Sequence, residues 1–269
     1  MLLVAKAGGN VLKDGVPEPI IRDIKTTVSS NRLVFVHGGG VEVTDIATRL
    51  GKPQKFVVSP KGFRSRYTDQ ETIEIYTMVM VGKLNSQIVT ALESHGISSV
   101  GLSGLDGRLI QATRKKRLII MDERGRRRVI DGGYTGTIKE VNTTLLNLLL
   151  NNGFVPVVAP VASSEEFEPL NVDGDRSAAY IAGFLKADKL ILLTDVEGLI
   201  IDERVVTKLN AHEARELLPR IGPGMITKIY ASLEALNMGV DEVIITSGLI
   251  EKPISSAIEN KCGTVIRSE

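Results

Sequence analysis

The feature that most constrains the fold is a pattern that occurs twice in the first forty residues: a short apolar run that ends in glycines. Residues 2–5 lead to Lys6 and the pair Gly8–Gly9, and residues 33–36 lead to Gly38–Gly40. Runs of this length are typical of buried strands. Glycine allows a tight turn and leaves the backbone amides open to a ligand, so each turn suits a phosphate group. Lys6 would add a positive charge beside the first one.

Strand-like and helix-like segments alternate along the rest of the chain. Residues 20–28 carry isoleucines on one face of a helix, and residues 189–193 form the clearest central strand. This alternation predicts an α/β fold, a three-layer αβα sandwich around a mainly parallel open sheet. Ligands of such sheets bind beyond the carboxyl ends of the strands, which is where the glycine turns fall.

Composition excludes several classes of protein and site. The content of 43% hydrophobic and 24% charged residues is ordinary for a globular protein. The single cysteine, Cys262, excludes an internal disulfide, and three scattered histidines disfavour a histidine-rich metal centre. No apolar run has the length of a membrane span, and the N-terminus lacks the layout of a secretory signal. We therefore expect a cytoplasmic protein without a membrane partner.

A strongly basic segment lies between residues 108 and 128. It carries a net charge of +7, which leaves −6 on the remaining chain. Residues 109–112, 117–121 and 127–130 read as short antiparallel strands, so we expect a basic β-hairpin insertion. A local field of this kind indicates an anionic partner. Nucleic acid is disfavoured, because no aromatic residues are interleaved with the arginines.

Common catalytic motifs are missing from the chain. It contains no Walker-type phosphate loop, no Gly-x-Gly-x-x-Gly after a strand and no Gly-x-Ser-x-Gly elbow. The remaining candidates are glycine turns, lysines and carboxylates at strand ends. These groups suit phosphate handling without a covalent protein intermediate.

A series of short motifs extends over nearly the whole chain. They are Lys6–Asn10, His37–Gly40, Met80–Asn85, Gly101–Gly107, Asp131–Gly136, Asn171–Asp175, Leu193–Gly198 and Gly224–Lys228. In this order they resemble the amino acid kinase family, and most closely N-acetylglutamate kinase and its relatives. The resemblance implies phosphoryl transfer from ATP to a carboxylate, with Mg²⁺ carried by the nucleotide and no metal site built by the protein.

The resemblance also implies roles for individual residues. Lys6 and Lys228 would neutralise the transferring phosphoryl group, and Asp175 would hold both lysines. An N-terminal lobe, residues 1–170, would bind the acceptor and form a homodimer contact, while residues 171–269 would bind the nucleotide within one continuous sheet. Acceptor-binding residues would be Gly38, Gly39, Gly40, Arg64, Arg66 and Asn171. Nucleotide-binding residues would be Gly8, Gly9, Thr194, Asp195, Val196, Gly198, Lys208, Gly224 and Met225.

Some roles rest on weaker grounds. His37 is predicted to be a packed, hydrogen-bonded residue at a strand end and not a catalytic base. Asp173 and Asp195 could instead cap helices or turns. Between the two arginines of the acceptor loop, Arg64 is favoured as the direct contact, and Arg66 remains an alternative.

Two departures from the N-acetylglutamate kinase pattern point to one branch of the family. The acceptor loop, residues 62–69, is two residues longer and has a second arginine, and the basic segment is the other departure. Both resemble the branch that phosphorylates aminoadipate or glutamate attached to a small acidic amino-group carrier protein in lysine and arginine synthesis, especially archaeal members that serve both pathways. Carrier-binding residues would be Arg114, Lys115, Lys116, Arg117, Arg124, Arg126, Arg127 and Arg128.

Two alternatives stay open. The chain could act on free N-acetylglutamate in arginine synthesis, without any protein partner. It could also be a non-catalytic nucleotide sensor on the same fold. The presence of Lys6, Asp175 and Lys228 together disfavours the sensor, which has no need of the full phosphoryl-transfer set.

Overall fold

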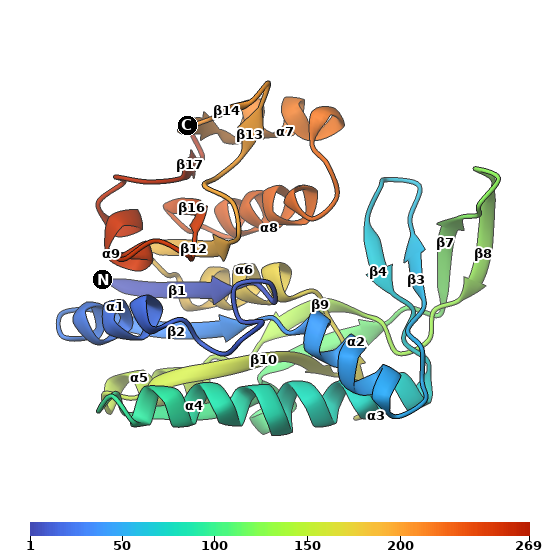
Figure 1. The fold of residues 1–269 in the computed structure, drawn as a ribbon, viewed down its shortest axis with the longest axis horizontal. Helices are drawn as coiled ribbons and strands as arrows, with labels where there is room; N and C mark the ends of the chain where they lie inside the picture. The colour runs from blue at the N-terminus through green and yellow to red at the C-terminus, as the bar shows by residue number, and fades with distance from the viewer.

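The computed structural model describes residues 1–269, and its centre is one eleven-stranded sheet (Figure 1). The main path of the sheet has the order β15-β17-β16-β12-β1-β2-β10-β6-β9. Five long strands at its centre are mutually parallel. They are β1 (Leu2–Ala7), β2 (Arg32–His37), β10 (Val155–Ser163), β12 (Lys189–Thr194) and β16 (Glu242–Ser247). The predicted three-layer α/β fold with a mainly parallel sheet is confirmed.

Shorter strands extend this sheet on both sides. One side has β17, antiparallel to β16, and then β15. On the other side β6 pairs with β9, and β5 and β11 pair with β10. Their bounds are β5 (Ser99–Gly104), β6 (Ile110–Arg114), β9 (Gly136–Val141), β11 (Pro169–Asn171), β15 (Lys208–Asn210) and β17 (Thr264–Arg267).

Helices cover both faces of the sheet because residues along each strand alternate between two apolar cores. In β1, Leu3 and Ala5 pack with α1 (Glu18–Val28), α4 (Ser86–Glu93) and α9 (Pro253–Ile258). Leu2 and Val4 face the opposite core. Its helices are α5 (Thr144–Asn151), α6 (Gly174–Leu185), α7 (Ala211–Leu217) and α8 (Met225–Asn237). A third, smaller core joins α2 (Gly40–Arg49) and α3 (Gln70–Thr77) to β10.

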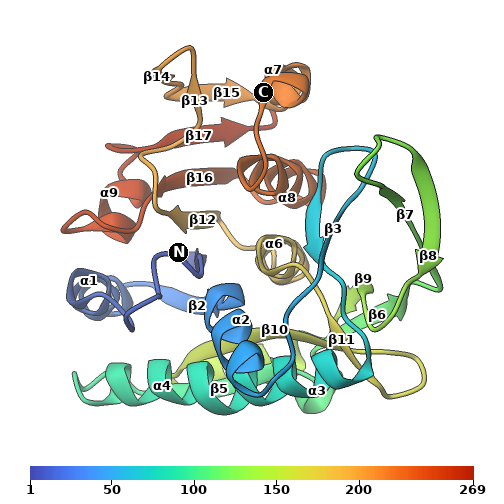
Figure 2. The same cartoon turned by 45° about the vertical axis from the view of Figure 1, so that its right-hand side comes forward.

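Two hairpins stand away from the sheet at the same end of the molecule (Figures 1 and 2). One consists of β3 (Phe56–Val58) and β4 (Arg64–Arg66), and the other of β7 (Arg117–Met121) and β8 (Arg127–Asp131). The two hairpins contact each other through β3 and β7. A further small hairpin, β13 (Ile200–Ile201) with β14 (Arg204–Val205), lies near the C-terminal edge.

Several local expectations are corrected. The segment 61–67, expected as a loop, includes the strand β4. The sequence Thr68–Glu71 fits a capping box that would begin the next helix at Thr68, but Asp69 caps it by accepting from the Thr72 N–H at 2.9 Å. Gly82 does not interrupt the helix that follows, because a π-helical segment, Met78–Asn85, joins α3 to α4. No helix is long and apolar enough to cross a membrane.

Candidate active site

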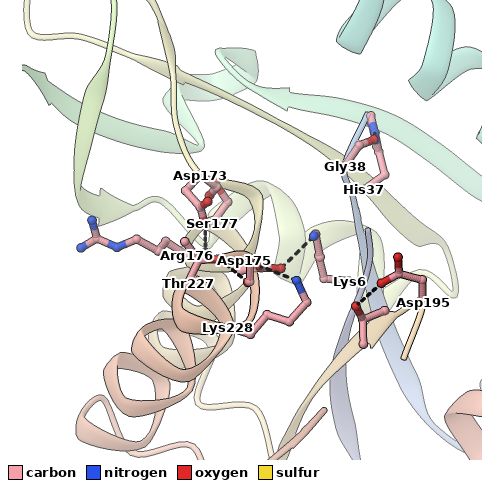
Figure 3. A network of polar contacts seen from close by, with 12 residues as sticks. Lys6, His37, Gly38, Asp173, Asp175, Arg176, Ser177, Asp195, Thr227 and Lys228 are labelled. Carbon is pink, nitrogen blue, oxygen red and sulfur yellow. Dashed lines mark hydrogen bonds and ion pairs between the residues drawn. The ribbon is translucent and has the colours of Figure 1, made fainter. Parts of the chain in front are cut away.

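The site is built around Asp175, which lies in the first turn of α6 and binds two lysines from different elements (Figure 3). Its Oδ1 lies 2.7 Å from Nζ of Lys6 in β1, and its Oδ2 lies 3.2 Å from Nζ of Lys228 in α8. The Lys6 and Asp175 side chains are almost fully buried. The predicted arrangement, in which one aspartate holds both lysines, is therefore present in the geometry.

Burial and charge act in opposite directions on this carboxylate. Burial favours the neutral form of Asp175, but the ammonium groups of Lys6 and then Lys228 outweigh it and hold the pKa at about 2. Asp173, two residues earlier, experiences the opposite balance. Desolvation in the cleft and then the negative charge of Asp175 raise its pKa. Asp173 also caps α6 by accepting from the Arg176 N–H at 2.9 Å, which was one of its two predicted roles.

The two glycine turns lie directly against each other above the ion triad. The Gly8 N–H donates to the Leu193 carbonyl, and the Gly38 N–H donates to the Ala7 carbonyl. A Cβ on Gly38 would lie 2.9 Å from the Gly9 amide nitrogen, which explains why glycine is needed there. The amides of Gly9 and Gly39 donate no hydrogen bond within the protein. Free amides at the start of α2 form a cradle for anionic oxygens.

His37 stabilises this cradle as a buried neutral residue. The Asn85 amide donates to its Nε2 at 3.1 Å, so Nδ1 carries the proton and donates to the Gly38 carbonyl at 3.0 Å. Burial, and to a smaller extent the charge of Lys6, lowers the pKa of His37 to about 4. The geometry fits the predicted packed histidine, since both ring nitrogens already have partners within the protein.

Two adjoining cavities meet at residues that line both of them, namely Lys6, Gly9, Gly40, Phe56, Arg64 and Arg66. The first has a volume of about 660 Å³ and the second about 1000 Å³. Every predicted acceptor residue lines the first cavity. Most predicted nucleotide residues line the second, namely Gly8, Gly9, Thr194, Asp195, Val196, Gly224 and Met225.

Two predicted nucleotide residues line neither cavity. Gly198 is buried, and a Cβ there would lie 2.7 Å from Thr264 Oγ1. Lys208 is exposed on the edge strand β15. The structure does not bring these two residues to the cavities, and their nucleotide contact stays a prediction.

The two arginines of the acceptor loop have different surroundings. Arg66 is buried and donates to the Gly40 carbonyl at 2.7 Å and to Thr44 Oγ1 at 2.9 Å. Arg64 is exposed and stacks on the Phe56 ring at 3.9 Å. Its guanidinium has no hydrogen bond or ion pair within the protein, so it is free to bind an acceptor, whereas Arg66 already fixes the start of α2.

The basic residues of the second hairpin divide into three groups. Arg114 is paired with Glu168 at 3.0 Å, and Arg126 and Arg128 are both paired with Asp122. Lys115 lines the first cavity. The other four cations are exposed and have no ion pair, namely Lys116, Arg117, Arg124 and Arg127.

Several site residues were missed by sequence reasoning. Thr68 Oγ1 accepts from the amide of the predicted Asn171 at 2.9 Å, and the Asn10 amide donates to the predicted Asp195 at 2.8 Å. Arg176 and Glu234 form an ion pair that joins α6 to α8 beside the first cavity. Asn10 lies next to the first glycine turn and could have been found from that position. The Arg176–Glu234 pair spans 58 residues and gives no local signal.

Comparison with known proteins places this geometry in a family. A model of the amino acid kinase family matches residues 1–247. The chain belongs to this family. In open α/β sheets ligands bind beyond the carboxyl ends of the strands, which agrees with the position of both cavities beside the turns that follow β1 and β2.

Named relatives match this amino acid kinase over its full length. A protein from Sulfolobus acidocaldarius is 48% identical over 98% of this chain and 100% of its own, and it is named LysW-aminoadipate/LysW-glutamate kinase. A relative with the same name from Saccharolobus islandicus is 44% identical over 98% of this chain and 99% of its own.

Solved structures agree with the fold. A Streptococcus mutans protein is 25% identical, with a TM-score of 0.81 over 100% of this chain and 99% of that one. Carbamate kinase from Giardia lamblia bound to AMP-PNP is 18% identical, with a TM-score of 0.68 over 99% of this chain and 98% of that one. At that identity the second match supports the fold alone.

Proposed function

We propose that this protein transfers the γ-phosphoryl group of ATP to the side-chain carboxylate of aminoadipate, and of glutamate, while either is attached to an amino-group carrier protein. The product is an acyl phosphate of lysine or arginine biosynthesis. The observation that carries the proposal is the buried Lys6–Asp175–Lys228 triad beneath free glycine amides. Full-length relatives named as kinases of LysW-bound acceptors support the choice of acceptor.

The chain offers the groups that phosphoryl transfer requires. The reaction depends mainly on positioning and on neutralising charge spread over the phosphoryl oxygens. Lys6 and Lys228 supply two positive charges, and Asp175 keeps them together without neutralising both. The amides of Gly9 and Gly39 are free to bind oxygens of the transferring group. An acceptor carboxylate, with an ordinary pKa of about 4.3, is already ionised at neutral pH and needs no general base.

We place ATP in the second cavity, with its γ-phosphate at the junction near Lys6 and Gly9. The N-termini of α2 and α8 border this cavity, and helix N-termini attract anions. No three His, Cys, Asp or Glu side chains are grouped for a metal ion. Mg²⁺ would therefore be held chiefly by ATP oxygens and water.

The acceptor would occupy the first cavity, where Asn171 and Arg64 lie. We assign the docking of the acidic carrier to the exposed basic residues of the β7–β8 hairpin and of the segment before it, because Lys115 and Leu118 line this cavity. Figure 2 shows the hairpin standing away from the sheet. Three arginines already have ion-pair partners within the protein: Arg114 pairs with Glu168, and Arg126 and Arg128 pair with Asp122. We expect these three to stabilise the hairpin and its base more than to bind the carrier. The lobe boundary at residues 170 and 171, a homodimer contact and a cytoplasmic location stay predictions.

The experiment that tests this function measures ATP turnover with three acceptors: free N-acetylglutamate, carrier-linked aminoadipate and carrier-linked glutamate, each at low and high salt. We expect turnover only with the carrier-linked acceptors, and a rise in their KM as salt increases, because salt screens the basic hairpin. Salt-insensitive turnover of free N-acetylglutamate would instead identify a kinase of the free molecule. ATP binding without turnover of any acceptor would favour a sensor.

A further inference from the structure

One cation in the acceptor cavity has no part in the mechanism above. Lys115 lies between β6 and β7 and lines the first cavity. Its N–H donates to the Thr135 carbonyl at 2.9 Å, and Thr135 forms an isolated parallel bridge with Asn171. Thr135 thus lies between Lys115 and Asn171, the residue that we expect to bind the acceptor. The position of Lys115 is also fixed by close packing, because a Cβ on Gly132 would overlap the Lys115 carbonyl.

The ammonium group of Lys115 has no partner within the protein, although most cations around it have one. Lys6 is paired with Asp175, Arg176 is paired with Glu234, and Arg66 donates to the Gly40 carbonyl. Lys115 is half-buried, and no hydrogen bond or ion pair ends on its side chain. Desolvation, and then the nearby positive charge of Arg176, lowers its pKa, and the negative charge of Asp173 opposes this only in part. A desolvated ammonium without a partner is costly, and a bound anion would offset that cost.

The number of free cations in the cavity can be compared with the carboxylates of each acceptor. Free N-acetylglutamate has one carboxylate besides the one that accepts the phosphoryl group, and Arg64 is free to bind it. Lys115 is a second free cation and would have no carboxylate to bind. A carrier-linked acceptor keeps the first carboxylate and also brings the acidic carrier chain to the mouth of the cavity.

We propose that Lys115 binds a carboxylate of the carrier beside the point where the acceptor is attached, and that it thereby selects carrier-linked over free acceptors. This inference rests on the proposed function and deepens it. It also divides the basic segment by role. Lys115 acts inside the cavity, whereas its neighbour Lys116 is exposed and belongs to the docking surface.

The test compares Lys115→Met with Lys116→Met and with Lys139→Met, a matched loss of charge on the exposed side of β9. For Lys115→Met we expect the KM for carrier-linked aminoadipate to rise about 10- to 100-fold, the range for one hydrogen bond to a charged group. We expect the rise to persist at high salt, because a desolvated ion pair is screened little. Lys116→Met should have a smaller effect that disappears at high salt. Lys115→Arg should restore part of the affinity.

Two outcomes would overturn the inference while leaving the proposed function intact. One is a KM for carrier-linked aminoadipate that rises no more in Lys115→Met than in Lys139→Met. The other is an equal rise for any residual turnover of free N-acetylglutamate, which would place Lys115 on the carboxylate that both acceptors share. If the wild-type protein does not phosphorylate carrier-linked acceptors at all, the proposed function fails and the inference fails with it. Lys115 has no side-chain partner, so its replacement leaves no buried group unpaired.

Discussion

Asp175 remains charged at a place where burial alone would make it neutral. The two lysines that lower its pKa to about 2 are the same groups that the proposed reaction requires. Because the folded-state pKa is depressed, the stabilisation is present above the ordinary carboxyl pKa near 4. It is lost as the pH falls towards 2. The triad therefore stays intact throughout the neutral range, and its lysines stay in position before ATP arrives.

Lys228→Ala tests whether this triad is catalytic. Removing one preorganised positive group from a charge-neutralising site lowers kcat by about 10²–10³-fold. ATP binding should largely survive, because Lys6 and the glycine amides remain. The measurement is ATP affinity by calorimetry beside kcat from steady-state turnover, with Lys139→Ala as the control for loss of a positive charge. Full turnover in Lys228→Ala would contradict the role assigned to the triad.

His37 makes a separate prediction about pH and stability. Its pKa falls from 6.5 to about 4 on folding, so the unfolded chain binds a proton between these values that the folded protein does not bind. The contribution of neutral His37 to the free energy of unfolding is therefore fully present above pH 6.5. It is lost as the pH drops towards 4, and the loss is about 3 kcal/mol at 1.36 kcal/mol per pKa unit. Urea unfolding of the wild type and of His37→Asn at pH 7 and pH 4 measures it. An equal loss in both proteins would show that His37 is not the source.

At the scale of elements, the two glycine turns work only if β1 and β2 end side by side. The register pairs Ala7 with His37, so Gly8 and Gly38 follow at the same level of the sheet. A side chain on Gly9 or on Gly38 would press on the backbone of the opposite turn. The close approach, and not the freedom of either turn alone, creates the cradle of free amides.

Gly38→Ala tests this close approach. Its Cβ would lie 2.9 Å from the Gly9 amide nitrogen, and backbone on both sides must move. We expect a loss of about 1–3 kcal/mol in stability, as for other overpacked sites, and a loss of turnover. Gly82→Ala is the matched control. Gly82 lies in a helical segment with nothing near its added Cβ, so stability should rise by about 0.5–1 kcal/mol. Similar stabilities for the two variants would contradict the packing argument.

The elements that the sequence predicts well are those with a local signal. The buried strands β1, β2 and β12 and the amphipathic helix α1 follow from apolar periodicity and lie where that periodicity predicts. The strand β4 was missed because Arg64–Arg66 is polar throughout, and its partner β3 was needed to define it. The π-helical segment at Met78–Asn85 has no distinguishing composition.

The candidate site shows the same division. Lys6 and the glycine turns could be listed from motifs at strand ends, and Lys228 from the resemblance to the family, but the contacts that occupy the other cationic side chains could not. These contacts join segments that are far apart in the sequence. Arg66 donates to a carbonyl at the start of α2, Arg114 pairs with Glu168, and Lys115 lines the acceptor cavity. Such contacts produce no periodic pattern of residues from which they could be predicted. For this reason the acceptor cavity needed the structure, whereas the phosphate cradle did not.

At the scale of the whole molecule, charge is distributed unevenly although the net charge is only +1. The excess of positive charge, +7, lies on residues 108–128, which lead into and include most of the β7–β8 hairpin. Lys115 and Leu118 of this segment line the first cavity, and the hairpin stands at the end of the molecule opposite α1 and α9 (Figure 1). A one-sided field of this kind raises the rate of encounter with an acidic partner and orients it. The hairpin would thus bring the carrier to the cavity with its acceptor facing inward.

Replacing the four exposed, unpaired hairpin cations together, as Lys116→Gln, Arg117→Gln, Arg124→Gln and Arg127→Gln, tests this orientation. We expect the association rate with the carrier to fall by about 10- to 1,000-fold at low salt. The difference from wild type should shrink as salt rises, because the wild-type attraction is screened. ATP affinity should not change, since none of the four lines the second cavity. A control matched in total charge removes Arg22, Lys25, Lys252 and Lys261, on and around α1 and α9 at the far end of the molecule, although Arg22 and Lys261 are ion-paired. If that control slows association as much, total charge and not the hairpin steers the carrier. If only the hairpin variant is slow, the basic hairpin is the surface that the carrier meets first.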